Sequence, residues 1–502
     1  MRAGGHLAAR FQFPRAANLF EVSCQGLFTF NLFEVATCNL ELYTIMKKLI
    51  ISLLAGAYAT GAFAQAENSF VHEQSEDGYV WPTDSLVLKK LDEWQDKKFG
   101  VLFHWGLYSV PGIVESWSIC SEDWITRRTD NYQEYKDWYW GLADEFNPVE
   151  FDPEKWAEIM DDAGMKYMIF TTKHHDGFNM FDTKYSDFSI AKGPFADNPK
   201  RDVAKHVFDA FRDKDFMIGA YYSKPDWHSQ WFWNDYYATP NRRINYKKEQ
   251  HPDWWQNYVD FTKNQMEELT TNYGNIDILW LDGGWITGDE VGLNELLPEA
   301  RKRNPGLISV DRVIKGPNEN YQTPERGIPR TQVNHPWESC IPLADNWGYV
   351  PGEKFKTPQE IVNILSEIVA KGGCFVLGVG PTPQGTILPE VEETLKGVGQ
   401  WLDANGKAIY NTRTTPDYND GNVWFTADKD GETLYAIYAL PMGENLPDVI
   451  EWEGNIPTGK MTMLDGKRNL KYTVNEDKVR VQLPKNHGNK PIAIEFKKKK
   501  NA

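Results

Sequence analysis

Cysteine is scarce in this sequence, with only five in 502 residues and none at CxxC spacing. This scarcity excludes a disulfide-knotted fold and a zinc ribbon. Basic residues are outnumbered too, because 54 lysines and arginines stand against 71 aspartates and glutamates, giving a formal net charge of -17. Such a surface repels phosphate backbones, so we expect no nucleic acid partner. With 41% hydrophobic residues, the chain is typical of a globular protein with a large core.

Long uncharged runs are also rare, and the clearest one lies at residues 46–64. Two lysines after Met46 precede an apolar run of about 14 residues and the small-x-small site Ala62-Phe63-Ala64, which is the order of a secretory signal peptide. The run is shorter than the roughly 20 residues that span a bilayer. We therefore predict cleavage near Ala64, export to the periplasm or the medium, and no membrane insertion. Residues 1–45, upstream of the signal, are interpreted as a misassigned start.

Short apolar runs alternate with amphipathic segments over most of the remaining chain. The apolar runs predict strands at 99–105, 167–173, 216–222, 276–281, 307–310 and 375–379. Apolar residues spaced by three and four predict helices at 154–165, 201–214, 254–271, 357–371 and 389–405. This alternation indicates repeated βα units, and no Gly-x-Gly-x-x-Gly turn follows a strand. The pattern favours an α/β fold, a (β/α)8-like TIM barrel over residues 65–410.

The hydrophobic period changes to two after about residue 411. Alternating segments occur at 422–426, 434–438 and 479–483. Asp430-Gly431 and Asp465-Gly466 are dipeptides typical of hairpin turns. These features predict that residues 411–502 form a C-terminal antiparallel β-sandwich docked on the barrel.

In a βα barrel, the reactive side chains are expected at the carboxyl ends of the strands. Here those ends carry many polar groups, including His104, His174, His175, Tyr221, Tyr222, Asp282 and Arg312, with Glu325 and Glu338 further along the chain. The histidine pair with a nearby aspartate suggests a metallohydrolase, whose first strand usually carries two histidines one residue apart. This chain has only His104 there, and the adjacent His174 and His175 point in different directions on a continuing strand. We therefore predict no metal site.

Asp282 follows an apolar run and precedes two glycines, which places a carboxylate at a strand end with room beside it. The alternative is an aspartate that only caps a turn. A partner carboxylate on a later loop would favour glycoside hydrolysis, which needs two carboxyl groups facing one bond. Most tryptophans belong to the core of a protein, but a group of them at the strand ends suits sugar binding. Six lie there: Trp105, Trp117, Trp227, Trp280, Trp285 and Trp337.

Four longer motifs occur together and in order: KFGVLFHWGLYSVP at 98–111, KHHDGF at 173–178, WLDG at 280–283, and a glycine-rich segment at 372–385. Over about residues 90–490 the chain resembles glycoside hydrolase family 29, the retaining α-L-fucosidases. The resemblance implies a barrel followed by a β-sandwich. It also implies removal of terminal α-L-fucose from oligosaccharides or glycoconjugates, with no metal or organic cofactor.

The same resemblance implies roles for individual residues. Asp282 matches the family's nucleophile, which forms a fucosyl-enzyme ester that water hydrolyses. The substrate-binding residues implied are His104, His174, His175, Tyr222, Trp280, Arg312, Trp117 and Glu115. Tyr221 is an alternative to Tyr222, because neighbouring strand residues point oppositely and the register is open. Ser116 separates Glu115 from Trp117, whereas the family often has Glu-Trp, which leaves the reach of Glu115 open.

Two glutamates are candidates for the acid/base. Glu325, in YQTPE at 321–325, resembles the family's acid/base segment, and Glu338, in PWESC at 336–340, matches a second acidic site that acts in catalysis or orients ligand. Whichever acts must hold its proton near neutral pH while Asp282 stays ionised. Retention requires the two carboxyl groups to be about 5 to 5.5 Å apart. The alternatives to a fucosidase are an inactive fucose-binding protein on the same fold and a barrel glycosidase for another sugar.

Overall fold

A computed structural model describes residues 78–499, except Asp123 and Pro240. The predictions of an upstream extension at 1–45 and a signal peptide at 46–64 lie outside the described residues. Within the described part, the search for a helix long and apolar enough to cross a membrane finds none.

Seven parallel strands form one sheet in the order β5-β4-β3-β2-β1-β7-β6. They are β1 (Phe99–Phe103), β2 (Tyr167–Lys173), β3 (Met217–Ser223), β4 (Ile278–Asp282), β5 (Ile308–Asp311), β6 (Glu338–Pro342) and β7 (Cys374–Val379). Almost every residue in them is buried. Because both faces of the sheet are covered, the strands have continuous apolar runs, and six of the seven were predicted.

Residues 318–326 close the sheet between β5 and β6. On the β5 side the Asn320 amide donates to the Ser309 carbonyl at 2.9 Å, and on the β6 side the Cys340 amide donates to the Pro324 carbonyl at 3.2 Å. Pro324 has no amide to donate, so this segment pairs with its neighbours without forming a regular strand. The strands and this irregular segment together form a (β/α)8-like barrel.

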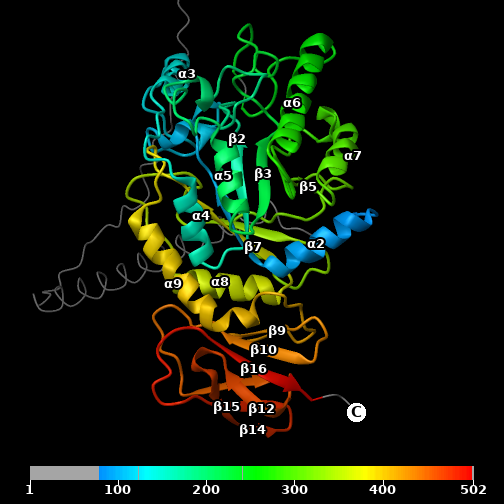
Figure 1. Cartoon of the computed structure of the whole chain (residues 1–502), viewed down its shortest axis with the longest axis vertical. Helices are drawn as coiled ribbons and strands as arrows, with labels where there is room; N and C mark the ends of the chain where they lie inside the picture. Colours follow the sequence, from blue (N-terminus) through cyan, green and yellow to red (C-terminus); the bar gives the residue numbers. More distant parts are fainter. Residues whose placement is uncertain (1–77, 123, 240, 500–502) are drawn as a thin grey trace, which may run out of the picture. The chain divides into compact units, whose positions relative to one another are not determined.

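The outer helices are α4 (Pro153–Asp162), α5 (Val203–Arg212), α6 (Pro252–Asn272), α7 (Leu293–Arg303), α8 (Pro358–Ala370) and α9 (Pro389–Asn405), while α2 (Ser85–Lys97) precedes β1 and α3 (Tyr132–Gly141) follows it (Figure 1). Short 3₁₀ turns occupy Leu107–Ser109, Ser116–Ile119, Leu142–Asp144, Ile190–Lys192, Asp289–Val291, Gly406–Ala408 and Asp465–Lys467. Helix starts are set by capping: the Asp152 side chain accepts from the Lys155 amide, and Thr357 forms a capping box with Glu360. Trp94 of α2 stacks on Tyr321 with ring centroids 4.2 Å apart and helps close the amino-terminal end of the barrel.

The C-terminal strands are antiparallel and form two sheets, in the orders β13-β12-β16-β10-β9-β8 and β11-β15-β14. They are β8 (Asn419–Asp420), β9 (Val423–Ala427), β10 (Thr433–Tyr438), β11 (Val449–Glu453), β12 (Pro457–Met463), β13 (Arg468–Asn469), β14 (Lys471–Asn475), β15 (Lys478–Gln482) and β16 (Ile492–Lys498). This domain contacts α8 and α9, since Asn363 donates to the Leu440 carbonyl at 2.7 Å and the Trp401 indole donates to the Pro491 carbonyl at 2.8 Å. A C-terminal antiparallel β domain is therefore confirmed.

Candidate active site

A cavity of about 190 Å³ lies at the carboxyl ends of the barrel strands. It is lined by the predicted residues His104, Glu115, Trp117, His174, Trp280, Asp282, Arg312 and Glu325. Its other lining residues are Leu102, Tyr221, Arg242, Gly284, Trp285, Val313, Cys340 and Trp347. Side chains from both ends of the sheet thus meet in one hollow, as the barrel geometry predicts.

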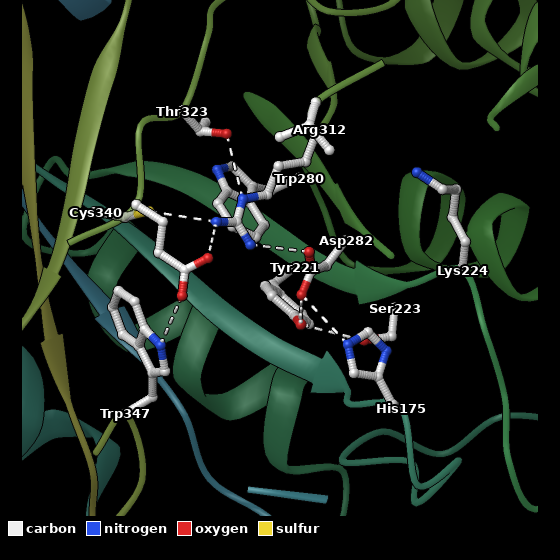
Figure 2. Close-up of polar contacts among 12 residues, drawn as sticks. His175, Tyr221, Ser223, Lys224, Trp280, Asp282, Arg312, Thr323, Cys340 and Trp347 are labelled. Atoms are coloured by element: carbon white, nitrogen blue, oxygen red, sulfur yellow. Dashed lines mark hydrogen bonds and ion pairs between the residues drawn. The ribbon is translucent and has the colours of Figure 1, made fainter. Parts of the chain in front are cut away.

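Asp282 ends β4, and both oxygens of its carboxylate accept hydrogen bonds (Figure 2). Its Oδ1 accepts from Arg312 Nη1 at 3.0 Å, and its Oδ2 accepts from the Tyr221 hydroxyl at 2.7 Å. His175 Nε2 lies 3.5 Å from the same Oδ2. Burial alone would raise the pKa of Asp282, but the Arg312 guanidinium, His175 and Tyr221 lower that pKa well below its ordinary value. Asp282 is therefore ionised at neutral pH.

Arg312, directly after β5, joins two carboxylates across the cavity (Figure 2). Besides Nη1 on Asp282, its Nη2 donates to Glu325 Oε2 at 2.5 Å. The second oxygen of Glu325 accepts from the Trp347 indole at 3.3 Å. The guanidinium also lies over the Trp280 ring, 4.9 Å from the ring centroid. A single fixed cation therefore orients a pair of carboxyl groups toward one small space.

The three histidines lie at the ends of β1 and β2 and are held neutral. Burial lowers the pKa of His104 to about 3, and it lowers the pKa values of His174 and His175 as well. His174 Nδ1 is hydrogen-bonded to the Ser116 hydroxyl. The His175 ring packs 5.0 Å from the Trp227 ring, and His175 does not line the cavity but lies behind Asp282. Neutral imidazoles both donate and accept, as sugar hydroxyls require.

Glu115 reaches the cavity, although Ser116 separates it from Trp117. Its Oε1 accepts from the backbone amides of Trp347 and Gly348, at 2.6 and 2.7 Å. A 3₁₀ turn that begins at Ser116 brings Trp117 to the wall as well. Glu115 and Trp117 therefore both lie at the site.

Comparison with known proteins identifies the family. The α-L-fucosidase family profile matches residues 66–407. The chain belongs to the α-L-fucosidase family. It is 31% identical over 379 residues to human plasma α-L-fucosidase, covering 71% of this chain and 77% of that protein. It is 30% identical over 457 residues to human tissue α-L-fucosidase, covering 86% and 91%.

Solved structures of α-L-fucosidases agree with this assignment. Alpha-L-fucosidase isoenzyme 1 from Paenibacillus thiaminolyticus superimposes with a TM-score of 0.69 at 28% identity, covering 83% of this chain and all of that one (100%). The α-fucosidase of Thermotoga maritima in complex with a mechanism-based inhibitor gives a TM-score of 0.68 at 27% identity, covering 84% and 100%. The predicted family and the predicted enzyme class, a glycoside hydrolase of the α-L-fucosidase type, are confirmed.

The structure of this fucosidase moves one predicted contact from Tyr222 to Tyr221. The Tyr222 hydroxyl accepts from Lys173 Nζ and donates to Gln265 Oε1, both at 2.8 Å, in a buried cluster away from the cavity. Tyr221 lines the cavity and stacks on Trp280 with ring centroids 5.1 Å apart. Successive strand residues face opposite sides of the barrel wall. A shift of one residue in the assumed register therefore decides which of the two tyrosines points to the cavity.

The two tyrosines give a matched pair of variants. Tyr221→Phe removes a hydrogen bond to Asp282, and we expect kcat/KM on a fucoside to fall about tenfold, the equivalent of one hydrogen bond to a charged group. Tyr222→Phe removes hydroxyl bonds outside the site, and we expect a lower melting temperature with kcat/KM per folded enzyme nearly unchanged. Steady-state kinetics and thermal denaturation of both variants check this. A greater kinetic loss for Tyr222→Phe would contradict the assignment.

Glu338, predicted as a second candidate acid/base, lies beneath the floor of the cavity and does not line it. Its carboxyl accepts from the Tyr167 hydroxyl at 2.8 Å, the Trp280 indole at 3.3 Å and the Tyr321 hydroxyl at 3.5 Å. Burial raises the pKa of Glu338 to about 7, although these donors lower it. Glu338 supports the Trp280 ring from inside the barrel, and of the two glutamates only Glu325 faces the cavity.

The raised pKa of Glu338 predicts a pH-dependent stability difference. The folded protein binds a proton at Glu338 more tightly than the unfolded chain, whose pKa is near 4.5. Its contribution to the free energy of unfolding therefore falls as pH rises from about 4.5 to 7. Glu338→Gln does not titrate, so its stability relative to the wild type should rise on the order of 2 kcal/mol between pH 5 and 8. Chemical denaturation at both pH values measures this, and parallel pH curves would contradict it.

The donor set at the centre of the site suits sugar hydroxyls better than a metal ion. The ligating atoms of His174, His175 and Asp282 all lie within 4.8 Å of one another, close enough for a small cation. However, His174 Nδ1 is already bonded to Ser116. Arg312 also places a positive charge 3.0 Å from the Asp282 carboxylate, which opposes a second cation there. Catalysis without a metal or cofactor stays a prediction, to be tested in EDTA.

Trp347 and Arg242 are among the lining residues that the sequence did not single out. Trp347 follows β6, whose first residues Glu338 and Ser339 are polar, so neither the strand nor its loop was predicted. Arg242 lies in the long connection between β3 and α6, where no periodic or turn pattern singles it out. The polar start of β6 is explained by the buried hydrogen-bond partners of Glu338.

Proposed function

We propose that this fucosidase removes terminal α-L-fucose from fucosylated glycans with retention of configuration, using Asp282 as nucleophile and Glu325 as acid/base. The observation that carries the proposal is the Arg312 bridge between these two carboxyl groups on one cavity. Retaining glycosidases need two carboxyl groups close together, since the nucleophile itself must reach the anomeric carbon.

In the first step, an ionised Asp282 oxygen attacks the anomeric carbon while Glu325 transfers its proton to the departing glycosidic oxygen. A fucosyl ester of Asp282 forms, and the glycosidic bond breaks. In the second step, Glu325 accepts a proton from water, whose oxygen attacks the same carbon and releases Asp282.

Neutral and aromatic groups support fucose binding in this cavity. Its volume of about 190 Å³ suits one monosaccharide. His104 lines the cavity, where its imidazole would bond a sugar hydroxyl. We assign the same role to His174, with His175 and Tyr221 acting mainly on Asp282. Trp117 and Trp280 also line the cavity and add apolar surface for the C–H groups of the sugar.

Hydrolysis of an aryl α-L-fucoside tests this proposal, using protein that starts at Gln65 and aryl α-galactoside and β-glucoside controls, all in EDTA. We expect rapid release from the fucoside alone, with α-L-fucose as the first product by proton NMR. Release of β-L-fucose first would exclude retention. Fucose binding by calorimetry without turnover would indicate an inactive binding protein, and preferential cleavage of another glycoside would indicate another sugar.

We also propose that the protein is exported to the periplasm or medium after cleavage near Ala64. The proposal is supported by the order of charged, apolar and small residues at 46–64. Amino-terminal sequencing of protein recovered from each cell fraction tests it. A chain that retains Met46 and stays in the cytoplasm would contradict it.

We propose that the two C-terminal sheets pack face to face as a sandwich. Trp452 of the three-stranded sheet contacts Phe425 and Phe496 of the six-stranded sheet, with ring centroids 5.7 and 5.8 Å apart. Buried residues of both sheets belong to one hydrophobic cluster. Trp452→Ala should therefore lower the melting temperature markedly, and an unchanged melting temperature would contradict a shared core.

A further inference from the structure

The wall of the cavity continues outward at Trp117. A cavity of about 190 Å³ holds one sugar, so we expect the remainder of a glycan to lie at the rim. Trp117 lines the cavity, and its ring centroid lies 6.2 Å from that of Trp124. Trp124 is 57% exposed, whereas the tryptophans of the barrel interior are buried. The Trp124 ring is thus open to solvent and contacts Trp117, a lining residue of the cavity.

Arg127 binds backbone carbonyls that precede Trp124 in the sequence. The Arg127 Nε donates to the Ser118 carbonyl at 2.7 Å, and its Nη2 donates to the Glu122 carbonyl at 3.0 Å. A second Nη2 bond reaches the Cys120 carbonyl. One guanidinium therefore holds three backbone carbonyls of residues 118–122, which include that of Glu122.

A charged pair lies beside this ring. Glu122 Oε1 accepts from Arg242 Nε at 3.0 Å. The Arg242 guanidinium lies over the Trp117 ring at 4.8 Å and over the Trp285 ring at 5.3 Å from their centroids. Arg242 lines the cavity and is partly exposed. The pair therefore presents a hydrogen-bond acceptor and several donors at the rim, on the same wall as Trp124.

We propose that Trp124, Glu122 and Arg242 form the subsite for the leaving-group sugar, and that this sugar is a neutral pyranose. The inference rests on the proposed function, because it assumes that fucose occupies the cavity. The Trp124 ring takes the C–H face of the pyranose, while Glu122 and Arg242 bind its hydroxyls. Because the Arg242 guanidinium is already paired with the Glu122 carboxylate, it gives little advantage to an anionic sugar.

The test compares a substrate with a sugar leaving group and one without. The substrates are fucosyl-galactose or fucosyl-N-acetylglucosamine disaccharides and α-L-fucosyl fluoride, whose leaving group has no ring. Trp124→Ala should lower kcat/KM on the better disaccharide about tenfold or more, and change kcat/KM on the fluoride less than twofold. Trp124→Phe, which keeps an aromatic face, should recover most of the loss.

Trp231→Ala is the matched control, because Trp231 is 39% exposed but packs on Phe261, which does not line the cavity. It should leave both substrates unchanged. A second readout uses fucosyl fluoride as donor and the free leaving sugar as acceptor: Trp124→Ala should lower transfer to the sugar relative to hydrolysis.

The outcomes separate this inference from the proposed function. Equal losses on disaccharide and fluoride would overturn the subsite, since Trp124 would then act on the cavity itself. No loss on any disaccharide would also overturn it. If the wild-type enzyme cleaved neither substrate, the proposed function would be wrong, and the subsite that rests on it would be wrong as well.

Discussion

Asp282→Ala is expected to lower kcat/KM for fucosides by at least about 10³-fold, because the variant has no oxygen to attack the anomeric carbon. Fucose binding should persist, since the other lining residues remain and Arg312 keeps its bond to Glu325. Kinetics with an aryl α-L-fucoside and calorimetry with fucose measure the two properties separately. A variant that kept a tenth of the wild-type rate would disprove the nucleophile assignment.

Azide gives a positive test of the same assignment. In the space left by the Asp282 carboxylate, azide can attack the anomeric carbon directly, with the glycosidic bond breaking as the C–N bond forms. One displacement inverts the configuration, so the product should be β-L-fucosyl azide. Formation of α-L-fucosyl azide would require two displacements, so the nucleophile would be a residue other than Asp282.

Much of the fold was predictable because buried parallel strands leave continuous apolar runs in the sequence. The run at 167–173 coincides with β2, and the helix at 389–405 coincides with α9. Other features were hidden for physical reasons. The segment at 318–326 completes the barrel through irregular pairing around Pro324, and α7 contains Pro298, which weakens its helical pattern.

The site was predictable where strand ends carry it and less so elsewhere. Asp282 and Arg312 follow apolar runs, so the barrel rule alone finds them. The choice between Tyr221 and Tyr222 depended on register, which the sequence of a strand buried on both faces does not reveal. Arg242 comes from a long connection whose path is decided by contacts with Trp117 and Trp285 rather than by local sequence.

Glu325→Gln is expected to produce a loss that depends on the leaving group. On a fucosyl disaccharide, the departing oxygen needs a proton, so kcat/KM should fall about 10² to 10⁴-fold. On α-L-fucosyl fluoride the leaving group needs little assistance, so kcat/KM, which reports the first step, should change little. The second step still lacks its base, and the fucosyl ester of Asp282 should accumulate and be visible by mass spectrometry.

Glu338→Gln is the matched control, because the same chemical change is made below the cavity floor rather than at its wall. Its effect should pass through Trp280 and be similar for both substrates. Azide distinguishes the roles again: with Glu325→Gln it attacks the ester on Asp282, and two successive displacements give α-L-fucosyl azide. If Glu338→Gln instead showed the leaving-group dependence and the α-azide, Glu338 would be the acid/base. Opposite azide anomers from Asp282→Ala and Glu325→Gln would assign the two carboxylates joined by Arg312 to the two halves of one retaining reaction.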